Sequence, residues 1–187
     1  MGKRRQQVSF APGQYVFPGG VYEAADADLA IQKPFQDPGL ARSASRAIGA
    51  LANTAIRETF EETGLLLAEK GDLPVIAHSS WRKFSEQGLA PIPSRLIYLG
   101  RAITPTYYPQ RFHARFFAAP FENFLGELIE DGELLDLRWL SRDSSGEFPM
   151  LDVTEFMLEE LERALKSQRR RTPLMSYRNN LTMIRYE

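Results

Sequence analysis

One long helical pattern, across residues 43–63, constrains the fold of this chain more than any other feature. Apolar and small side chains recur in it at intervals of three and four, which places them on one stripe of a helix. They are Ile48, Leu51, Ala52, Ala55, Ile56, Thr59 and Phe60. Ser43 or Ser45 is a candidate cap for its start, and Gly64 is a typical C-terminal stop. We therefore predict an amphipathic helix whose stripe packs against a core.

Strand-like runs surround this helix. Short β-type patterns lie at residues 14–17, 65–67, 73–78, 95–103, 112–118 and 134–140. Residues 23–42 contain prolines and several small residues, and we expect them to form a loop. A second amphipathic run extends from Asp152 to about Ser167 and begins with a capping-box pattern. This order of elements predicts an α+β fold, with a mixed sheet held between helices.

Length and composition narrow the class of protein. A chain of 187 residues is expected to form a single domain, 1–187. We find no apolar run of ~18 residues that predicts a membrane span, and no apolar stretch follows the basic start as in a secretory signal. The absence of cysteine excludes disulfides, thiolate metal sites and cysteine nucleophiles. We expect a cytoplasmic protein.

The charge balance argues against a dedicated nucleic-acid binder. The formal net charge is −1, whereas such proteins usually carry a clear basic excess. Basic clusters stand at residues 3–5 and 169–171. We interpret them as a solvated chain end and a helix C-terminus, where cations suit the helix dipole. A contact with polyphosphate or nucleic acid is the alternative for both clusters.

Three carboxylates gather at the C-terminal end of the predicted helix. Glu58, Glu61 and Glu62 share a face, because positions i, i+3 and i+4 are neighbours on a helix. Like charges at these spacings repel by roughly 0.2–0.5 kcal/mol per pair. Carboxylates at a helix C-terminus lose a further ~0.3–1 kcal/mol each. Arg57 offsets part of this cost, and we expect something positive to lie against the cluster.

A divalent metal ion is the natural counter-charge. Mg²⁺ prefers oxygen ligands and is usually held by one or two carboxylates, waters and substrate phosphates. A cluster of glutamates without histidine or cysteine therefore favours Mg²⁺ or Mn²⁺ over zinc. Such a site neutralises phosphate charge and orients a water for in-line attack. The alternative is a solvated acidic helix face.

The sequence around these glutamates resembles a known motif. Residues 57–65, Arg-Glu-Thr-Phe-Glu-Glu-Thr-Gly-Leu, resemble the second half of the Nudix box, Arg-Glu-hydrophobic-x-Glu-Glu-x-Gly-hydrophobic. Residues 17–20, Phe-Pro-Gly-Gly, resemble the turn that opens the box, with Gly20 as the box glycine. The resemblance implies a Nudix fold over most of the chain. It also implies an Mg²⁺- or Mn²⁺-dependent hydrolase that cleaves the pyrophosphate bond of a nucleoside diphosphate linked to a further group, X.

The chain departs from the family pattern in three ways. Thirty residues separate Asp26 from Arg57 where the family has seven, so the box carries an insertion at about residues 27–49. Asp26 stands in the place of the first glutamate of the box, and Thr59 in the place of a hydrophobic residue. The first strand of the family is largely missing before Gln14, and residues 3–5 resemble the end of such a strand.

The split box itself resembles a Nudix subgroup that includes acyl-coenzyme A diphosphatases. In that subgroup Phe-Pro-Gly-Gly is followed by an Asp-x-Asp, here Asp26-Ala27-Asp28, and then by an insertion. The resemblance implies that a coenzyme A ester is one candidate substrate. The expected partner is thus a small-molecule diphosphate, with neither a membrane nor a nucleic acid.

The resemblance also implies roles for single residues. Glu58, Glu61 and Glu62 are expected to bind the metal together with the Gly20 carbonyl. Glu58 or Glu61 is the candidate acceptor for the proton of the attacking water. Arg57 is expected to orient a glutamate through a charge-assisted bond.

Further candidates lie outside the box. Glu133, just ahead of a predicted strand, is a candidate second base. Arg82 and Arg111 are candidates for phosphate binding, and Tyr108 for stacking on a base, which is worth ~1–3 kcal/mol per base. For Glu133 and both arginines the alternative is solvated surface.

Other side chains have an ordinary structural interpretation. The aromatic residues and histidines are expected to pack in the core or in loops: Trp81, Tyr107, Tyr108, His78 and His113. For Asp26 and Asp28, a loop or capping role is the alternative to a functional one.

Two further hypotheses follow from the departures. A Nudix-fold binding or regulatory protein without turnover is the main alternative to an enzyme, motivated by Asp26, the insertion and the missing strand. A missing edge strand also leaves a sheet edge open, which invites a homodimer.

Overall fold

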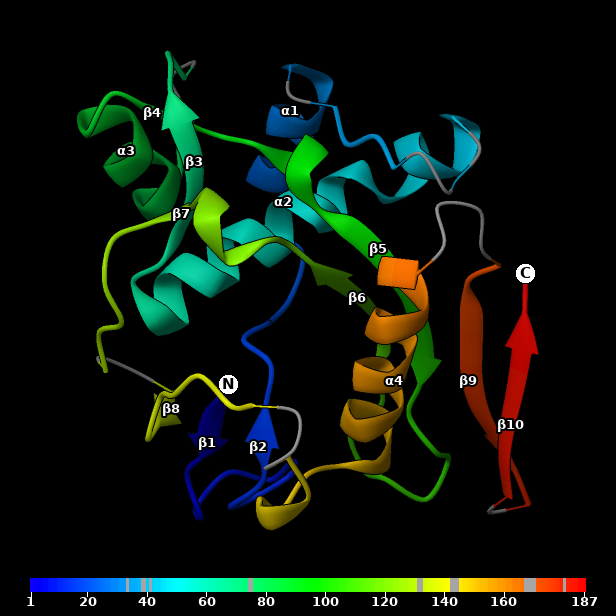
Figure 1. The fold of residues 1–187 in the computed structure, drawn as a ribbon. Coiled ribbons are helices and arrows are strands. Elements are labelled where there is room, and N and C mark those ends of the chain that lie inside the picture. Colours follow the sequence, from blue (N-terminus) through cyan, green and yellow to red (C-terminus); the bar gives the residue numbers. More distant parts are fainter. Residues whose placement is uncertain are drawn as a thin grey trace.

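The computed structural model of the chain describes residues 1–32, 34–37, 40, 42–73, 76–130, 133–141, 145–166, 171–179 and 181–187 (Figure 1). Within them the helices are α1 (Ala24–Gln32), α2 (Arg42–Thr63), α3 (Ser79–Glu86) and α4 (Asp152–Lys166). The strands are β1 (Gly2–Arg4), β2 (Tyr15–Val16), β3 (Leu66–Lys70), β4 (Leu89–Pro91), β5 (Ile97–Ile103), β6 (His113–Ala118), β7 (Phe124–Leu125), β8 (Leu134–Leu135), β9 (Pro173–Arg178) and β10 (Leu181–Tyr186). None of the helices in these ranges is long and apolar enough to cross a membrane.

Helix α2 confirms the helix predicted at residues 43–63. Ala52 and Ile56 of the predicted stripe are buried, at 0% and 1% exposure. Gly64, with a φ of +78°, ends the helix, and its N–H donates to the Phe60 carbonyl at 2.9 Å. Glycine adopts this left-handed conformation without the steric cost of a Cβ. The predicted C-terminal stop is therefore correct.

The strands that the structure describes form three small sheets. The largest has the order β10-β9-β5-β6, in which β5 and β9 are parallel and the other neighbours are antiparallel. The other two have the orders β4-β3-β7 and β2-β1-β8, and all their pairings are antiparallel. The described strands therefore include a mixed sheet, as the sequence predicted.

Two hydrophobic clusters lie on opposite faces of β5 and β6. Phe117 packs with the cluster that contains Ala52 and Ile56 of α2, whereas its neighbour Phe116 packs with the cluster around Met157 of α4. Successive side chains of a strand point to opposite faces, so the two phenylalanines mark the two sides of the sheet. Figure 1 shows α2 and α4 on these two sides. The predicted α+β fold with a sheet between helices is confirmed.

The loop predicted for residues 23–42 is wrong over Ala24–Gln32, which forms α1. The Asp26 carboxylate accepts the Glu23 backbone N–H at 3.1 Å, the contact that the third helical residue makes in a capping box. Leu29 is fully buried, and α1 packs along α2. A helix of nine residues offers too short a pattern for periodicity to predict, because its stability comes from tertiary packing.

The strand predicted at residues 73–78 is also wrong where the structure describes it. Residues 73 and 76–78 are not in a strand, while residues 74 and 75 lie outside the described part. His78 instead caps α3, where its Nδ1 accepts the Ser80 backbone N–H at 3.2 Å. The strand predicted at 134–140 is reduced to β8, because Asp136 leaves the extended conformation with a φ of +48°.

A short strand, β1, lies where residues 3–5 were expected to form the end of a largely missing first strand. It has three residues and lies between β2 and β8. Lys3 faces Tyr15 on one side and Leu135 on the other. The basic cluster at residues 3–5 therefore begins inside a sheet rather than on a loose chain end.

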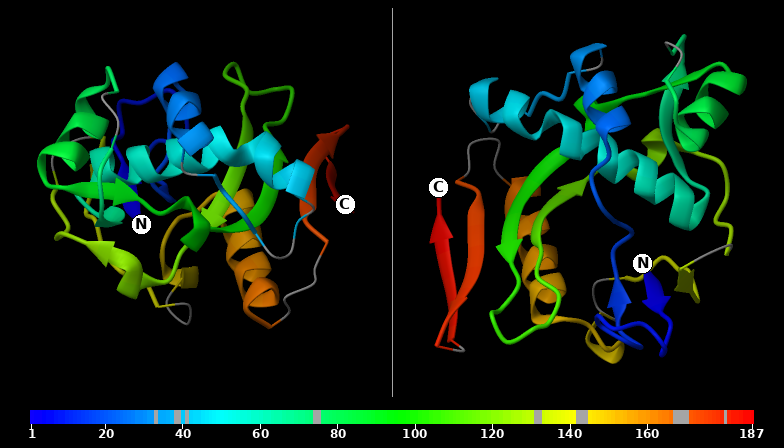
Figure 2. Two further views of the ribbon diagram at one scale, coloured as in Figure 1. Left: turned by 90° about the horizontal axis from the view of Figure 1, so that it is seen from above. Right: turned by 180° about the vertical axis from the view of Figure 1, so that it is seen from behind.

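The C-terminal hairpin of β9 and β10 was not predicted from the sequence. Figures 1 and 2 show it at one side of the molecule, with β10 outermost. The apolar side chains of β10 are exposed: Leu181, Met183, Ile184 and Tyr186. An open edge strand of this kind can pair with another chain. The homodimer stays a prediction.

Candidate functional site

The C-terminal half of α2 contains a buried arginine in an ion pair. Arg57 is 1% exposed and Asp26 is fully buried. The guanidinium Nε lies 3.0 Å from Asp26 Oδ1, and Nη2 lies 3.0 Å from Oδ2. This two-point contact uses the planar fork of arginine against a planar carboxylate, which fixes both groups in orientation. It joins α1 to α2 at the point where the charged residues gather.

Asp26 receives more donors than Arg57 alone. Thr54 Oγ1 donates to its Oδ2 at 2.8 Å, and Trp81 Nε1 donates to its Oδ1 at 3.2 Å. With the Glu23 N–H, which lies just ahead of α1, the buried carboxylate has partners from α2, from α3 and from the residue before α1. A buried charge is tolerated when it is paired and hydrogen-bonded in this way. Asp26 thus caps α1, which was the alternative interpretation of this residue, and it also anchors Arg57. Asp28, by contrast, is exposed.

The remaining donors of Arg57 bind near Glu58, Glu61 and Glu62, and we call the surface of α2 that carries these three residues the carboxylate face. Its Nη1 donates to Glu58 Oε1 at 2.9 Å and to Glu61 Oε2 at 3.1 Å. Its Nη2 donates to the Val21 carbonyl at 2.8 Å. Because Asp26 holds the guanidinium, the guanidinium in turn holds two carboxylates. The predicted orienting contact of Arg57 is present in the structure.

The Phe-Pro-Gly-Gly turn lies against the same face. The Gly19 N–H donates to Glu62 Oε2 at 2.7 Å. A Cβ on Gly20 would lie 2.4 Å from the carboxylate carbon of Glu58, closer than any real Cβ contact. Around Gly19, by contrast, a Cβ would meet nothing within 4 Å. Only glycine at position 20 therefore lets the backbone approach Glu58 so closely.

Burial, together with neighbouring carboxylates, raises the pKa of Glu58 and of Glu62. Burial raises the pKa of Glu62 to about 7, and the charges of Glu58 and Glu133 contribute to this rise. The hydrogen bond from the Gly19 N–H and the charge of Arg4 act in the opposite direction and lower the pKa. Burial also raises the pKa of Glu58, although Arg57 opposes this. Carboxylates whose charged form is disfavoured in this way are stabilised by a nearby cation.

The residues present fit a magnesium or manganese ion. The donors are oxygens, and Glu58 and Glu62 lie beside the Gly19-Gly20 turn. Among the described residues, no set of three histidine, cysteine, aspartate or glutamate side chains converges as a ready-made metal cage. Mg²⁺ does not need one, since it keeps several waters and takes one or two carboxylates plus phosphate. The role of Glu61 as a ligand stays a prediction, because its carboxylate is engaged by Arg57 and Ser80.

Comparisons with known proteins point to one family. No protein-family model matches the chain. A crystal structure of a Nudix hydrolase from Alicyclobacillus acidocaldarius is 30% identical and superposes with a TM-score of 0.66, over 89% of this chain and 86% of that one. The chain belongs to the Nudix hydrolase superfamily. A curated Caenorhabditis elegans protein that bears the name nudix hydrolase 7 is 27% identical over 148 residues. This alignment covers 73% of the chain but only 41% of the length of that relative.

The two halves of the Nudix box are separated by an insertion in the sequence of this chain, but they lie together in the structure. The insertion predicted at about residues 27–49 contains most of α1 and the start of α2. Figure 1 shows α1 lying against α2, and the Asp26–Arg57 pair forms across their junction. The aspartate that stands in the place of the first glutamate therefore still reaches the box arginine.

Glu133 lies next to the basic cluster of β1. It precedes β8, whose Leu134 faces Arg4 across the sheet. Glu133 and Arg4 both act electrostatically on Glu62. A cavity of about 460 Å³ opens here, lined by Arg4, Arg5, Val8, Ser9 and Glu133. The size falls within the range of ~300–1,000 Å³ typical of small-molecule sites.

The predicted substrate-binding residues lie in other elements. Arg82 is exposed on α3, two residues beyond Ser80. Arg111 and Tyr108 lie between β5 and β6, where the Tyr108 ring packs against Phe10 with centroids 5.7 Å apart. No described contact joins these three to the glutamates of α2, and their substrate roles stay predictions.

The remaining candidates divide between packing and other roles. Trp81, 1% exposed, packs in the core as predicted and also donates to Asp26. His78 caps α3, and His113 is exposed on β6, so the packing prediction is wrong for His113. Ser80, which donates to Glu61, was missed, because nothing local in the sequence links α3 to α2.

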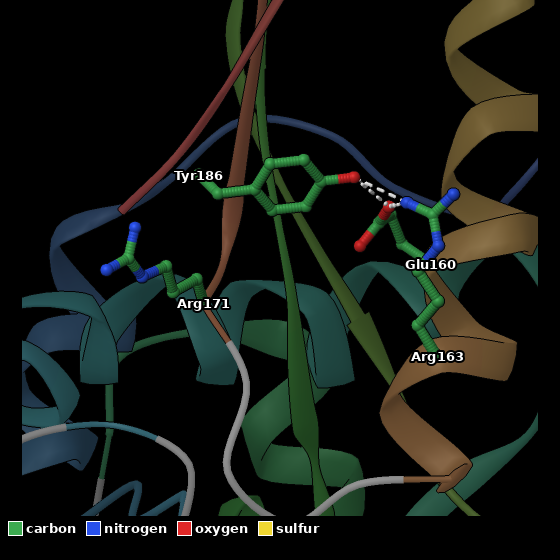
Figure 3. Close-up of a pocket in the computed structure, with 4 residues that line it drawn as sticks. All are labelled: Glu160, Arg163, Arg171 and Tyr186. Carbon is green, nitrogen blue, oxygen red and sulfur yellow. Dashed lines mark hydrogen bonds and ion pairs between the residues drawn. The ribbon is translucent and has the colours of Figure 1, made fainter.

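A second cavity, of about 450 Å³, lies between α4 and the C-terminal hairpin (Figure 3). Glu160 is 2% exposed and accepts hydrogen bonds from Tyr186 Oη, at 2.8 Å, and from Arg163. Figure 3 shows Arg171 on the other side of the Tyr186 ring. In the basic cluster at residues 169–171, Arg169 and Arg170 lie outside the described residues. Glu160, Arg163 and Tyr186 are already paired with one another, so this cavity is a poorer candidate site than the face of α2.

Proposed function

We propose that this protein is a Mg²⁺- or Mn²⁺-dependent hydrolase that cleaves the pyrophosphate bond of a nucleoside diphosphate linked to X. The observation that carries the proposal is the carboxylate face of α2. There Arg57 is already bound to Asp26 and contacts Glu58 and Glu61, while Glu58 and Glu62 lie beside the glycine turn. A fold needs no such concentration of negative charge, and a site for a cation and phosphates does.

Each residue has a defined part in this proposal. A divalent cation, when bound, supplies charge neutralisation at the phosphates and activation of water. Glu58, Glu61 and Glu62, with the Gly20 carbonyl, would hold it, and Arg57 keeps Glu58 and Glu61 in place. Glu133, exposed at the edge of the neighbouring cavity, is the candidate second base for the proton of the attacking water.

We assign the cavity beside β1 to the substrate. Arg4 and Arg5 line it together with Glu133, and two of these charges reach Glu62 electrostatically. Arginine binds phosphate through paired donors, so a phosphate chain fits here with its scissile bond near the carboxylate face. This favours the polyphosphate interpretation of the basic cluster at residues 3–5 over the solvated chain end.

The identity of X is a narrower part of the proposal. The split box resembles the acyl-coenzyme A diphosphatase subgroup, which makes a coenzyme A ester the first candidate. A cytoplasmic location and a monomer–dimer equilibrium through the β10 edge are predictions that accompany it. The chain spans about two fifths of the length of its Caenorhabditis elegans relative.

A hydrolysis panel tests the proposal. The substrates are acyl-coenzyme A, coenzyme A, ADP-ribose, NADH, dinucleoside polyphosphates and nucleoside triphosphates, each with Mg²⁺, with Mn²⁺ and with chelator. Metal-dependent cleavage of one class is expected and identifies X. If the folded protein binds nucleotides but cleaves nothing on the panel, the binding or regulatory protein without turnover becomes the better account.

Substitution of Arg5 tests the assignment of the substrate cavity. Arg5→Ala is expected to raise KM by about tenfold, the effect of losing about 1.4 kcal/mol of binding. The matched control is Arg178→Ala, which removes an exposed arginine at the end of β9. Equal KM values for the two variants would place the substrate elsewhere.

A further inference from the structure

The first turn of α3 contacts the carboxylate face of α2. Ser80 Oγ donates to Glu61 Oε1 at 2.5 Å, and the other oxygen, Oε2, accepts from Arg57 Nη1 at 3.1 Å. Ser80 is 5% exposed, whereas the Glu61 side chain is 31% exposed. The carboxylate of Glu61 is therefore held at both oxygens from the protein side and open to solvent on the other.

Ser80 is itself fixed from several directions. His78 caps the helix by accepting the Ser80 N–H at 3.2 Å, and His78 Nε2 lies 3.3 Å from a carboxylate oxygen of Glu23. The next residue, Trp81, is buried and donates to Asp26 at 3.2 Å. The hydroxyl that faces Glu61 is thus attached to a turn that these contacts hold to α2 and to the residues around α1.

We propose that Ser80 is a positioning residue for Glu61, and that Ser80 and Arg57 together fix the orientation of this carboxylate toward the metal and substrate. The inference rests on the proposed function of the α2 face. With a donor on each oxygen, the carboxylate cannot rotate about its last side-chain bond without losing a contact. Each oxygen retains a lone pair for a further partner. Without the serine hydroxyl, Glu61 is held by Arg57 at one oxygen and is free to turn.

Such supporting contacts have measurable effects. Partners that hydrogen-bond to ligating side chains typically change metal affinity or activity about 10–100-fold when they are removed. A serine with a purely structural role would change neither quantity while the fold persists. Ser79 offers a matched control, because it is the neighbouring residue of the same turn and is exposed.

The experiment compares Ser80→Ala, Ser80→Thr and Ser79→Ala in the full chain. Mn²⁺ alone is titrated by calorimetry, and kcat and KM are measured for the substrate that the panel identifies. Ser80→Ala is expected to weaken Mn²⁺ binding or lower kcat by about 10–100-fold, with KM changed less than kcat. Ser80→Thr, which keeps the hydroxyl, is expected to recover most of the loss, and Ser79→Ala to match the parent protein.

A double-mutant cycle with Glu61→Gln shows whether Ser80 acts through Glu61. The effect of Ser80→Ala is expected to disappear in the Glu61→Gln background. An equal effect in both backgrounds would overturn the proposal, as would unchanged Mn²⁺ affinity and kcat in Ser80→Ala. If the parent protein cleaves nothing, the proposed function fails, and the Mn²⁺ titration of Ser80→Ala against Ser79→Ala still decides the role of Ser80.

Discussion

Two helices of this molecule each carry a cluster of charged side chains around a buried glutamate, and the clusters differ in their charge balance. On α4, the carboxylate of Glu160 accepts one hydrogen bond from Arg163 and one from Tyr186. On α2, the buried Arg57 is fully engaged by Asp26 and two glutamates, and Glu62 lies beside it against the glycine turn. Both helices bury charge, yet only in the α2 cluster do several buried or half-buried carboxylates share one arginine. On α4, the second carboxylate near Arg163, that of Glu159, is exposed to solvent.

The difference indicates what each cluster is for. A single buried glutamate that is paired with one arginine and one tyrosine, as on α4, is a satisfied structural contact, which joins the helix to β10. An excess of carboxylates costs free energy through burial and mutual repulsion unless a cation compensates for it. Substitutions in the two clusters should therefore have opposite signatures: in α2 they should alter activity, and in α4 only stability.

The largest expected effect is on turnover. Glu62→Gln keeps a side-chain oxygen for the Gly19 N–H but removes the charge. Activity is expected to fall by about 10²–10⁴-fold, the range seen when catalytic carboxylates are lost. Stability is expected to stay the same or rise slightly, because repulsion with Glu58 is relieved. Steady-state kinetics and thermal unfolding of the same preparation check both parts, and full activity in this variant would refute the assigned face.

The ion pair at the base of the cluster should dominate stability. Asp26→Asn leaves the buried guanidinium of Arg57 without its counter-charge, which costs about 3–5 kcal/mol when a buried pair is broken. For a chain of this size the melting temperature should drop by roughly 6–20 °C. Asp28→Asn, an exposed change two residues later, should stay within about 0.5 kcal/mol of the parent. Equal unfolding curves for the two variants would show that the pair does not anchor α1.

The glycine turn gives a sharper contrast between neighbouring positions. Gly20→Ala places a Cβ against the Glu58 carboxylate and must displace it, while Gly19→Ala meets open space. The displaced atoms are the end of a side chain, so the fold should tolerate the change. We expect activity to fall about 10–100-fold in Gly20→Ala, the range typical of changes that disturb the residues around a metal-binding side chain. We expect Gly19→Ala to leave activity unchanged. Similar kinetics for both would mean that close approach at Gly20 is irrelevant.

The smallest effect belongs to α4. Glu160→Gln keeps the hydrogen bond from Tyr186 but removes the ion pair with Arg163, which is about half exposed. The expected loss is about 0.5–1.5 kcal/mol of unfolding free energy, with kcat and KM unchanged. Denaturant unfolding and the same kinetic assay check this prediction. A large loss of activity here would erase the distinction between the two clusters.

Local sequence patterns predicted the parts of the site that lie close together in the chain. The stripe of α2, its stop at Gly64 and the shared face of Glu58, Glu61 and Glu62 all follow from helical spacing. The Phe-Pro-Gly-Gly turn was found through its resemblance to the family box. The α+β class followed from the order of the elements.

The parts that the sequence did not reveal depend on contacts between distant residues. Asp26 and Arg57 pair across 31 positions, and Ser80 and Glu61 across 19. Helix α1 is too short to show a period and is stabilised by packing on α2. The exposed β10 depends on its pairing with β9 rather than on an apolar face. Such contacts arise only when the fold brings the elements together.

Diffraction from Mn²⁺-soaked crystals, with the anomalous signal of the metal, tests the central claim most directly. The account predicts a Mn²⁺ peak bound by the carboxylates of Glu58 and Glu62 beside Gly20, which is lost in Glu62→Gln. Absence of a peak on this face at saturating Mn²⁺, or a peak at Glu160 instead, would contradict the account.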